Sequence, residues 1–170
     1  MLRKQNNGIL FRKIMHVVHH SQMPVTDRHI QHGDTSVLLH CIAVACLSMR
    51  FAQILEKMGM TVRTDELVRG ALLHDYFLYD WHEKDPSHAL HGFTHPIRAL
   101  RNADKQFRLS ERERDIISRH MFPLTFHPPR YIESILVCIA DKICSLYETF
   151  TRGTYQRLRK QMIPLVLIHR

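Results

Sequence analysis

Apolar residues recur along most of this chain every three or four positions, which is the spacing of amphipathic helices. Alternating apolar and polar runs joined by hairpin turn residues are not found, so the pattern predicts an all-α fold. Near the start, the apolar positions predict a helix within residues 1–20, and residues 22–33 read as a connecting loop. The expected fold is therefore a compact single-domain helical bundle.

Capping residues and glycines bound the next two predicted helices. Polar residues at 34–36 offer N-caps for a long helix that ends near residue 58, because Gly59 favours a helix stop. Thr64 is the expected cap of the following helix, and acidic residues in its first turn support this start. That helix is expected to close at the adjacent pair 74–75.

The second half of the chain predicts three more helices. Pro96 fits the first turn of one of them, which places His95 at or near its N-cap. Ser110 begins a capping box for a helix that ends near His120. The last long helix is expected at about residues 131–150.

The length of the chain, 170 residues, suits one domain with a single core. Apolar residues make up 45% and charged residues 24%, which is typical of a folded globular protein. We expect a single domain over residues 1–170 with a motif core at about 34–150. An N-terminal helix and loop over 1–33 precede this core, and a basic tail over 151–170 follows it. The aromatic, histidine-rich residues 76–94 are expected to form an irregular loop.

Composition also predicts the compartment and the class of partner. The longest apolar run, Val37 to Leu47, is interrupted by His40 and is too short for a membrane span. The four cysteines lie within apolar helical pattern and form no Cys-x-x-Cys pair, which indicates buried thiols in a reducing compartment. We therefore expect a cytoplasmic protein with no membrane partner. The net charge of +8 comes without an aromatic-basic strand motif, so no clear nucleic-acid partner is indicated and a small anionic substrate explains the charge.

The apolar run near the end of the chain, residues 163–168, bears on the oligomeric state. It could pack on the core or on a second copy of the chain. The sequence favours neither, so a homo-oligomer stays open.

Six imidazole and carboxylate residues stand out against the apolar pattern. His40 and Asp141 have apolar neighbours inside predicted helices, where a buried ionisable group needs a compensating partner. Histidine and aspartate are ligand types that hold a divalent transition metal. The candidate metal ligands, in chain order, are His40, His74, Asp75, His95, His120 and Asp141.

This ordered series resembles the HD-domain superfamily of metal-dependent phosphohydrolases, over roughly residues 34–150. The resemblance implies that four of the residues hold one ion: His40, His74, Asp75 and Asp141. His95 and His120 match the two additional histidines of two-metal members. Asp75 would then bridge both ions and is the expected catalytic carboxylate. One or two divalent transition-metal ions are implied, with Fe, Mn, Co, Ni and Zn as candidates.

Several side chains are candidates for contacting a phosphorylated substrate. Lys142 directly follows a candidate ligand and is the expected catalytic cation, with a surface salt bridge as an equal alternative. Arg69, Arg98 and His91 are the expected substrate-binding residues. His91 also competes with His95 for the role of ligand, because the sequence His-Gly-Phe-Thr-His offers either imidazole. We favour His95 because helical pattern continues after it.

The resemblance implies that a metal-activated water cleaves a phosphoester bond in a nucleotide or another small phosphorylated compound. After the His-Asp pair, the chain departs from the His-Asp-x-x-Glu-Asp pattern of the alarmone hydrolases. After His120 it lacks the Gly-Tyr-Pro signature of one class of cyclic-di-GMP phosphodiesterases. Two alternatives stay open: a mixed-valent di-iron oxygenase with the same ordered ligands, and a non-catalytic nucleotide-binding metal module. Metal identity together with oxygen uptake separates the oxygenase from a hydrolase.

Overall fold

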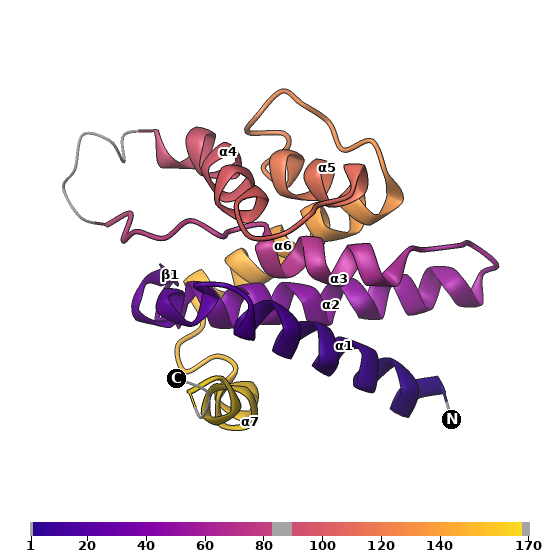
Figure 1. The fold of residues 1–170 in the computed structure, drawn as a ribbon, viewed down its shortest axis with the longest axis horizontal. Coiled ribbons are helices and arrows are strands. Elements are labelled where there is room, and N and C mark those ends of the chain that lie inside the picture. The colour runs from indigo at the N-terminus through magenta and orange to yellow at the C-terminus, as the bar shows by residue number, and fades with distance from the viewer. Residues whose placement is uncertain (1, 83–89, 168–170) are drawn as a thin grey trace.

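The computed structural model of the chain describes residues 2–82 and 90–167, without the side chains of 2–9 and 163–167. Helices dominate the described part of the chain, which confirms the all-α prediction (Figure 1). The α-helices are α1 (Leu2–His19), α2 (Val37–Lys57), α3 (Thr64–Leu73), α4 (His91–Asp104), α5 (Glu111–Arg119), α6 (Ile132–Phe150) and α7 (Gln156–Leu167). The remaining regular elements are a 3-10 helix η1 (Met23–Arg28) and the strands β1 (Ile30–His32) and β2 (Thr35–Ser36).

Helices α2 and α3 form the centre of the bundle. α2 packs on α3 and α6, α3 packs on α5, and α5 packs on α6 and α4. Figure 1 shows α2 and α3 running across the middle of the molecule, with α4 and α5 on one side and α1 on the other. Five elements therefore approach one another near the ends of α3 and α5, although they are far apart in the sequence.

α2 is the core helix of the bundle. Its residues from Val37 to Ala45 are all buried, as expected of a helix that is apolar on every face. Ser36 caps it, because its hydroxyl accepts a hydrogen bond from the Leu39 backbone N–H at 3.4 Å. Among the described helices it alone is long and apolar enough to cross a membrane, yet 67% of its apolar window is buried inside the protein. Its apolar surface is therefore used mainly for packing.

The segment 22–33, predicted as a loop, contains η1 and the first strand of a small antiparallel hairpin. Gly33 makes the hairpin turn with a φ of +59°, which glycine adopts without steric cost. A Cβ at this position would collide with the backbone carbonyl oxygen of Glu148, so the turn lies directly against α6. The sequence pattern missed this hairpin because strands of three and two residues are too short to show an alternating period.

α4 begins at His91, about one turn before the predicted start. Leu90 precedes it in the left-handed conformation, with a φ of 59°, and its carbonyl accepts the backbone N–H groups of Phe93 and Thr94. His95 therefore lies in the second turn and not at the N-cap, and Pro96 lies inside the helix. The expectation was wrong because Pro96 was assigned to the first turn from its frequency there.

Three further expectations on elements can be compared with the structure. Ser110 forms the predicted capping box with Glu113 at the start of α5. Thr64 is the first residue of α3, one position after the cap residue Arg63. The predicted basic tail over 151–170 contains α7, so it is largely helical. The packing of the apolar side chains at 163–168 lies outside the described residues.

Candidate metal centre

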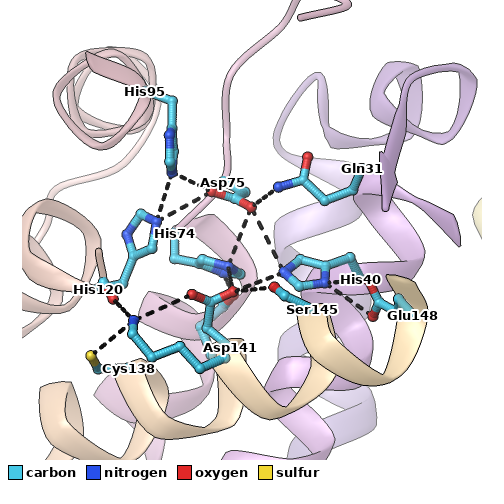
Figure 2. A network of polar contacts seen from close by, with 12 residues as sticks. Gln31, His40, His74, Asp75, His95, His120, Cys138, Asp141, Ser145 and Glu148 are labelled. Atoms are coloured by element: carbon cyan, nitrogen blue, oxygen red, sulfur yellow. Dashed lines mark hydrogen bonds and ion pairs between the residues drawn. The ribbon is translucent and has the colours of Figure 1, made fainter. Parts of the chain in front are cut away.

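The side chains of the six candidate ligands meet in the interior of the bundle (Figure 2). All of them are buried, with exposed fractions of at most 6%. Each comes from a helix or from the residues directly after one, so helix packing fixes their positions. The contributors are His40 from α2, His74 and Asp75 after α3, His95 from α4, His120 after α5, and Asp141 from α6.

Asp75 lies between two groups of imidazoles, and each of its oxygens faces one group (Figure 2). Its Oδ1 lies 3.2 Å from His95 Nε2 and 3.4 Å from His120 Nε2. Its Oδ2 lies 3.5 Å from His74 Nε2 and 3.8 Å from His40 Nε2. One carboxylate therefore touches both halves of the site.

Asp141 completes the group formed by His40 and His74. Its Oδ1 lies 3.2 Å from His40 Nε2 and 3.7 Å from His74 Nε2. Each of these three residues offers one ligand atom, and the three atoms all lie within 4.8 Å of one another. The same holds for His74, Asp75 and His120. The geometry thus offers two overlapping sites for a metal ion.

Each of the four imidazoles is held through its Nδ1. His74 Nδ1 lies 2.7 Å from the carbonyl oxygen of Ala71, and the Nδ1 atoms of His95 and His120 each lie 2.8 Å from a backbone carbonyl oxygen. His40 Nδ1 lies 2.8 Å from the Glu148 carboxylate. These oxygens only accept hydrogen bonds, so Nδ1 carries the proton and the Nε2 lone pair of a neutral ring faces the centre.

When the rings are neutral, acceptors face acceptors at the centre of the site, whereas without a cation a proton on His40 Nε2 makes the hydrogen bond to Asp141 Oδ1 at 3.2 Å. His95 Nε2 and His120 Nε2 are 2.8 Å apart, and both point toward Asp75. His74 Nε2 and Asp75 Oδ1 are buried without a hydrogen-bond partner in the described part of the chain. A buried acceptor without a donor is costly. Nitrogen and oxygen donors arranged in this way fit divalent transition-metal ions.

The carboxylates and imidazoles also shift one another's pKa values. Burial alone would raise the pKa of Asp75, but neighbouring imidazoles, first of all His74, outweigh it and hold this pKa well below its ordinary value. Burial alone would lower the pKa of His40, but its hydrogen bonds to Asp141 and Glu148 raise it well above the ordinary value. The site therefore favours positive charge beside its carboxylates, and a bound cation would supply such charge.

Two residues that support the site were not found from the sequence. Gln31 in β1 donates a hydrogen bond from Nε2 to Asp75 Oδ2 at 2.6 Å. Glu148 orients His40, and its side chain is completely buried. Glu148 had a usable signal, because it follows Asp141 by seven residues and therefore lies on the same face of α6. Gln31 had none, because its hairpin was not predicted.

A cavity of about 860 Å³ opens from the candidate metal centre. It is lined by Asp75, His95, His120 and Asp141, and also by His91 and Lys142. The Lys142 ammonium donates to the His120 carbonyl oxygen at 2.8 Å and lies 4.0 Å from Asp141 Oδ2. The His91 ring stacks on the His95 ring, with a distance of 4.6 Å between the ring centroids. Lys142 and His91 are thus in reach of a bound molecule.

The structure places Arg69 and Arg98 away from this cavity, so their predicted contact with substrate has no support in their positions. Arg69 forms an ion pair with Glu113 at 2.5 Å, on the side of α3 that faces α5. Five residues separate it from His74, which turns the side chain about 140° around a helix. Arg98 faces a separate cavity of about 250 Å³ beside Tyr79.

The chain was compared with protein families, curated proteins and solved structures. The HD domain family model matches residues 37–146, which is more than half of the chain and includes all six candidate ligands. No curated protein and no solved structure matches the chain significantly.

Proposed function

The chain belongs to the HD domain family, and from that premise we propose that it is a metal-dependent phosphohydrolase that acts on a small phosphorylated compound. The observation that carries the proposal is the fixed orientation of four buried imidazoles. Their Nδ1 atoms are engaged by oxygen acceptors, and their Nε2 atoms surround Asp75. Such a set of lone pairs has little use in a protein core other than holding cations.

The residues divide into two groups that would hold the ions. His40, His74 and Asp141 would hold one ion, and His95 and His120 would hold a second, with one Asp75 oxygen toward each. When bound, such ions supply an activated water at neutral pH and neutralise charge on phosphoryl oxygens. The chain's own contribution is rigid placement, because every ligand is buried and held by a helix.

Lys142 is the proposed contact for the phosphate group. It lines the cavity beside Asp141, and the side chain is 42% exposed. An ammonium has three N–H donors, of which two are directed to the His120 carbonyl and the Cys138 sulfur. The third is available to a phosphate oxygen.

The proposal is tested with purified protein reconstituted separately with Mn²⁺, Co²⁺, Ni²⁺, Fe²⁺ and Zn²⁺. Phosphate release is measured over a panel of phosphomonoesters and nucleotides, and ring opening of cyclic dinucleotides is followed by chromatography, under air and under argon. Metal-dependent phosphate release of equal rate in both atmospheres is the expected result. Product formation that requires oxygen would instead identify an oxygenase and overturn the proposal.

Asp75→Asn is the matched variant for this experiment, because it keeps the side-chain size and removes the charge. We expect phosphate release to fall at least about 100-fold and bound metal to fall below one ion per chain, since the carboxylate faces both groups of ligands. Asp104→Asn serves as the control, because Asp104 pairs with Arg114 on the surface of the bundle. A D75N protein that keeps its metal and its activity contradicts the proposed role.

A further inference from the structure

The cavity above the candidate metal centre has a polar floor and largely apolar walls. Candidate ligands form the floor, whereas these side chains line the walls: Trp81, Met121, Pro123 and Leu124. On the basis of the proposed hydrolase function, we propose that the substrate is a phosphomonoester whose leaving group carries an apolar, aromatic group. The phosphate would lie at the floor and the aromatic group against the apolar walls.

One wall is a column of stacked rings that rises from the metal ligands. The His91 ring stacks on His95 with a centroid distance of 4.6 Å and an interplanar angle of 20°. Trp81 stacks on His91 with a centroid distance of 5.1 Å and an angle of 12°. Near-parallel flat rings offer faces and edges to another planar group, which pairs with them in a stacked or edge-on arrangement.

A second wall is formed by the loop after α5, which supplies Met121, Pro123 and Leu124. Leu124 is 44% exposed although it lines the cavity, so a ligand can still cover its apolar surface. A Cβ built at Gly92 would lie only 3.1 Å from the Leu124 side chain, which shows how closely this loop approaches the start of α4. Removing the apolar surface of this wall from water favours an apolar ligand over a hydrated one.

The charge around the cavity matches a single phosphate. Lys142 is the only lysine or arginine that lines the cavity within residues 2–82 and 90–167. Two divalent cations and Lys142 would bring five positive charges, whereas Asp75, Asp141 and the hydroxide formed from the metal-activated water would bring three negative ones. The difference is balanced by the dianion of a phosphomonoester, whose second pKa is about 6. A polyphosphate brings more negative charge, for which the described lining offers no further cation.

The reaction is a hydrolysis with water as the second reactant. The water oxygen forms a new bond to phosphorus while the bond from phosphorus to the leaving oxygen breaks. The leaving oxygen takes up a proton and departs as an alcohol, and inorganic phosphate remains. No oxidant or reductant is needed.

The first test compares substrates of similar intrinsic reactivity. Benzyl phosphate, 2-naphthylmethyl phosphate and glycerol 3-phosphate all release a primary alcohol, so differences in rate report on recognition by the cavity. With metal-loaded protein we expect kcat/KM for the two aromatic esters to exceed that for glycerol 3-phosphate at least 10-fold. Equal or higher values for glycerol 3-phosphate, or for a nucleoside triphosphate, would overturn the inference.

The second test measures binding without turnover. Trp81 is the only tryptophan of the chain, so its fluorescence reports on the ring column directly. We expect benzylphosphonate to quench this fluorescence and to bind at least 10-fold more tightly than methylphosphonate. Leu124→Asn should remove most of this preference, whereas Leu146→Asn, at an exposed leucine outside the cavity lining, should leave it unchanged.

The two tests separate the inference from the proposed function. If all phosphomonoesters are cleaved without aromatic preference, the hydrolase proposal stands and the inference is wrong. If no ester is cleaved but benzylphosphonate binds with the expected preference, the hydrolase proposal is wrong and the apolar recognition stands. If benzylphosphonate and methylphosphonate bind equally, the apolar recognition is overturned whatever the activity.

Discussion

Glu148 is a single residue on which the orientation of His40 depends. It lies in α6, has no exposed surface, and accepts the His40 Nδ1 proton at 2.8 Å. A carboxylate in this position fixes the ring and makes its Nε2 a better electron donor. The turn at Gly33, far away in the sequence, packs directly against the backbone carbonyl of Glu148. The residue is thus a positioning residue with no described contact to the cavity.

Glu148→Gln is expected to weaken the binding of one of two ions by about 10- to 100-fold, because the charge behind His40 is lost. The measurement is a metal titration followed by elemental analysis. Glu133→Gln is the matched control, since Glu133 is equally buried but accepts a hydrogen bond from the Arg63 backbone N–H far from the ligands. Unchanged metal affinity in E148Q would show that Glu148 only fills space.

His95 and His91 offer a direct test at the second group of ligands. His95 Nε2 lies 3.2 Å from Asp75 Oδ1, whereas His91 supplies its carbonyl oxygen and the face of its ring. His95→Ala is therefore expected to lower the bound metal from two ions to one or fewer. His91→Ala should retain two ions, as measured by elemental analysis. It should also weaken the binding of aromatic ligands, as measured by the quenching of Trp81 fluorescence. The reverse pattern would exchange the two assignments.

The six candidate ligands could be predicted from the sequence, and so could Lys142 and His91 beside them, whereas Gln31 and the ring column could not. His40 and Asp141 were visible because ionisable groups interrupt an apolar pattern, and the family resemblance ordered all six. Gln31 and the stacking of Trp81 on His91 arise from tertiary contacts without a local signal. Arg69 was misplaced because nearness in sequence to a ligand does not imply the same helix face.

At the scale of the element, the contact between α3 and α5 depends on Gly70. A Cβ at Gly70 would lie 2.6 Å from Cδ1 of Ile116, a distance that real Cβ atoms do not show. The glycine therefore allows a close approach of two helices, one of which leads into the His74–Asp75 pair and the other into His120. The same approach keeps these ligands within reach of each other.

Gly70→Ala is expected to lower the free energy of unfolding by about 1–3 kcal/mol, because the packed core has no room for the added methyl group. Urea unfolding followed by circular dichroism measures this change. Adding Ile116→Val removes the atom of closest contact, and the double variant should recover part of the loss. A G70A protein as stable as the parent would mean that α3 and α5 separate at little cost.

Helix termini could be predicted where side chains make the cap. Ser110 and Glu113 satisfy each other's backbone N–H groups, so the capping box was readable. α4 has no side-chain cap, and its start is set by the left-handed conformation of Leu90, which sequence does not signal. The small hairpin and α7 were missed for related reasons, since neither has a strong local pattern.

At the scale of the whole molecule, five helices that pack on one another through the core each bring candidate ligands to the same place. Bound ions would therefore link α2, α3, α4, α5 and α6 at one point. Burying carboxylates and imidazoles costs desolvation free energy, and the free energy of binding those ions would offset this cost. The cytoplasmic location stays a prediction, and the sequence neither favours nor excludes a homo-oligomer.

Removal of metal by a chelator is expected to lower the melting temperature. Two ions at 100 times their Kd contribute about 5 kcal/mol, which corresponds to roughly 10–20 °C for a chain of this size. Calorimetry with and without a chelator measures the difference, and D75N, which we expect to bind little metal, should show almost none. A melting temperature that does not respond to a chelator in the parent would argue against bound ions in the core.

Gln31 and Glu148 both lie outside residues 37–146, the segment that the HD domain model matches. A protein cut to that segment would retain all six ligands, yet it would lose the amide that anchors Asp75 and the carboxylate that steadies His40. Such an excised fragment should bind metal weakly even where it folds. A match to the shared segment in another chain therefore does not show by itself that the chain binds metal well. Metal binding also depends on the residues that the flanking sequence places against the ligands.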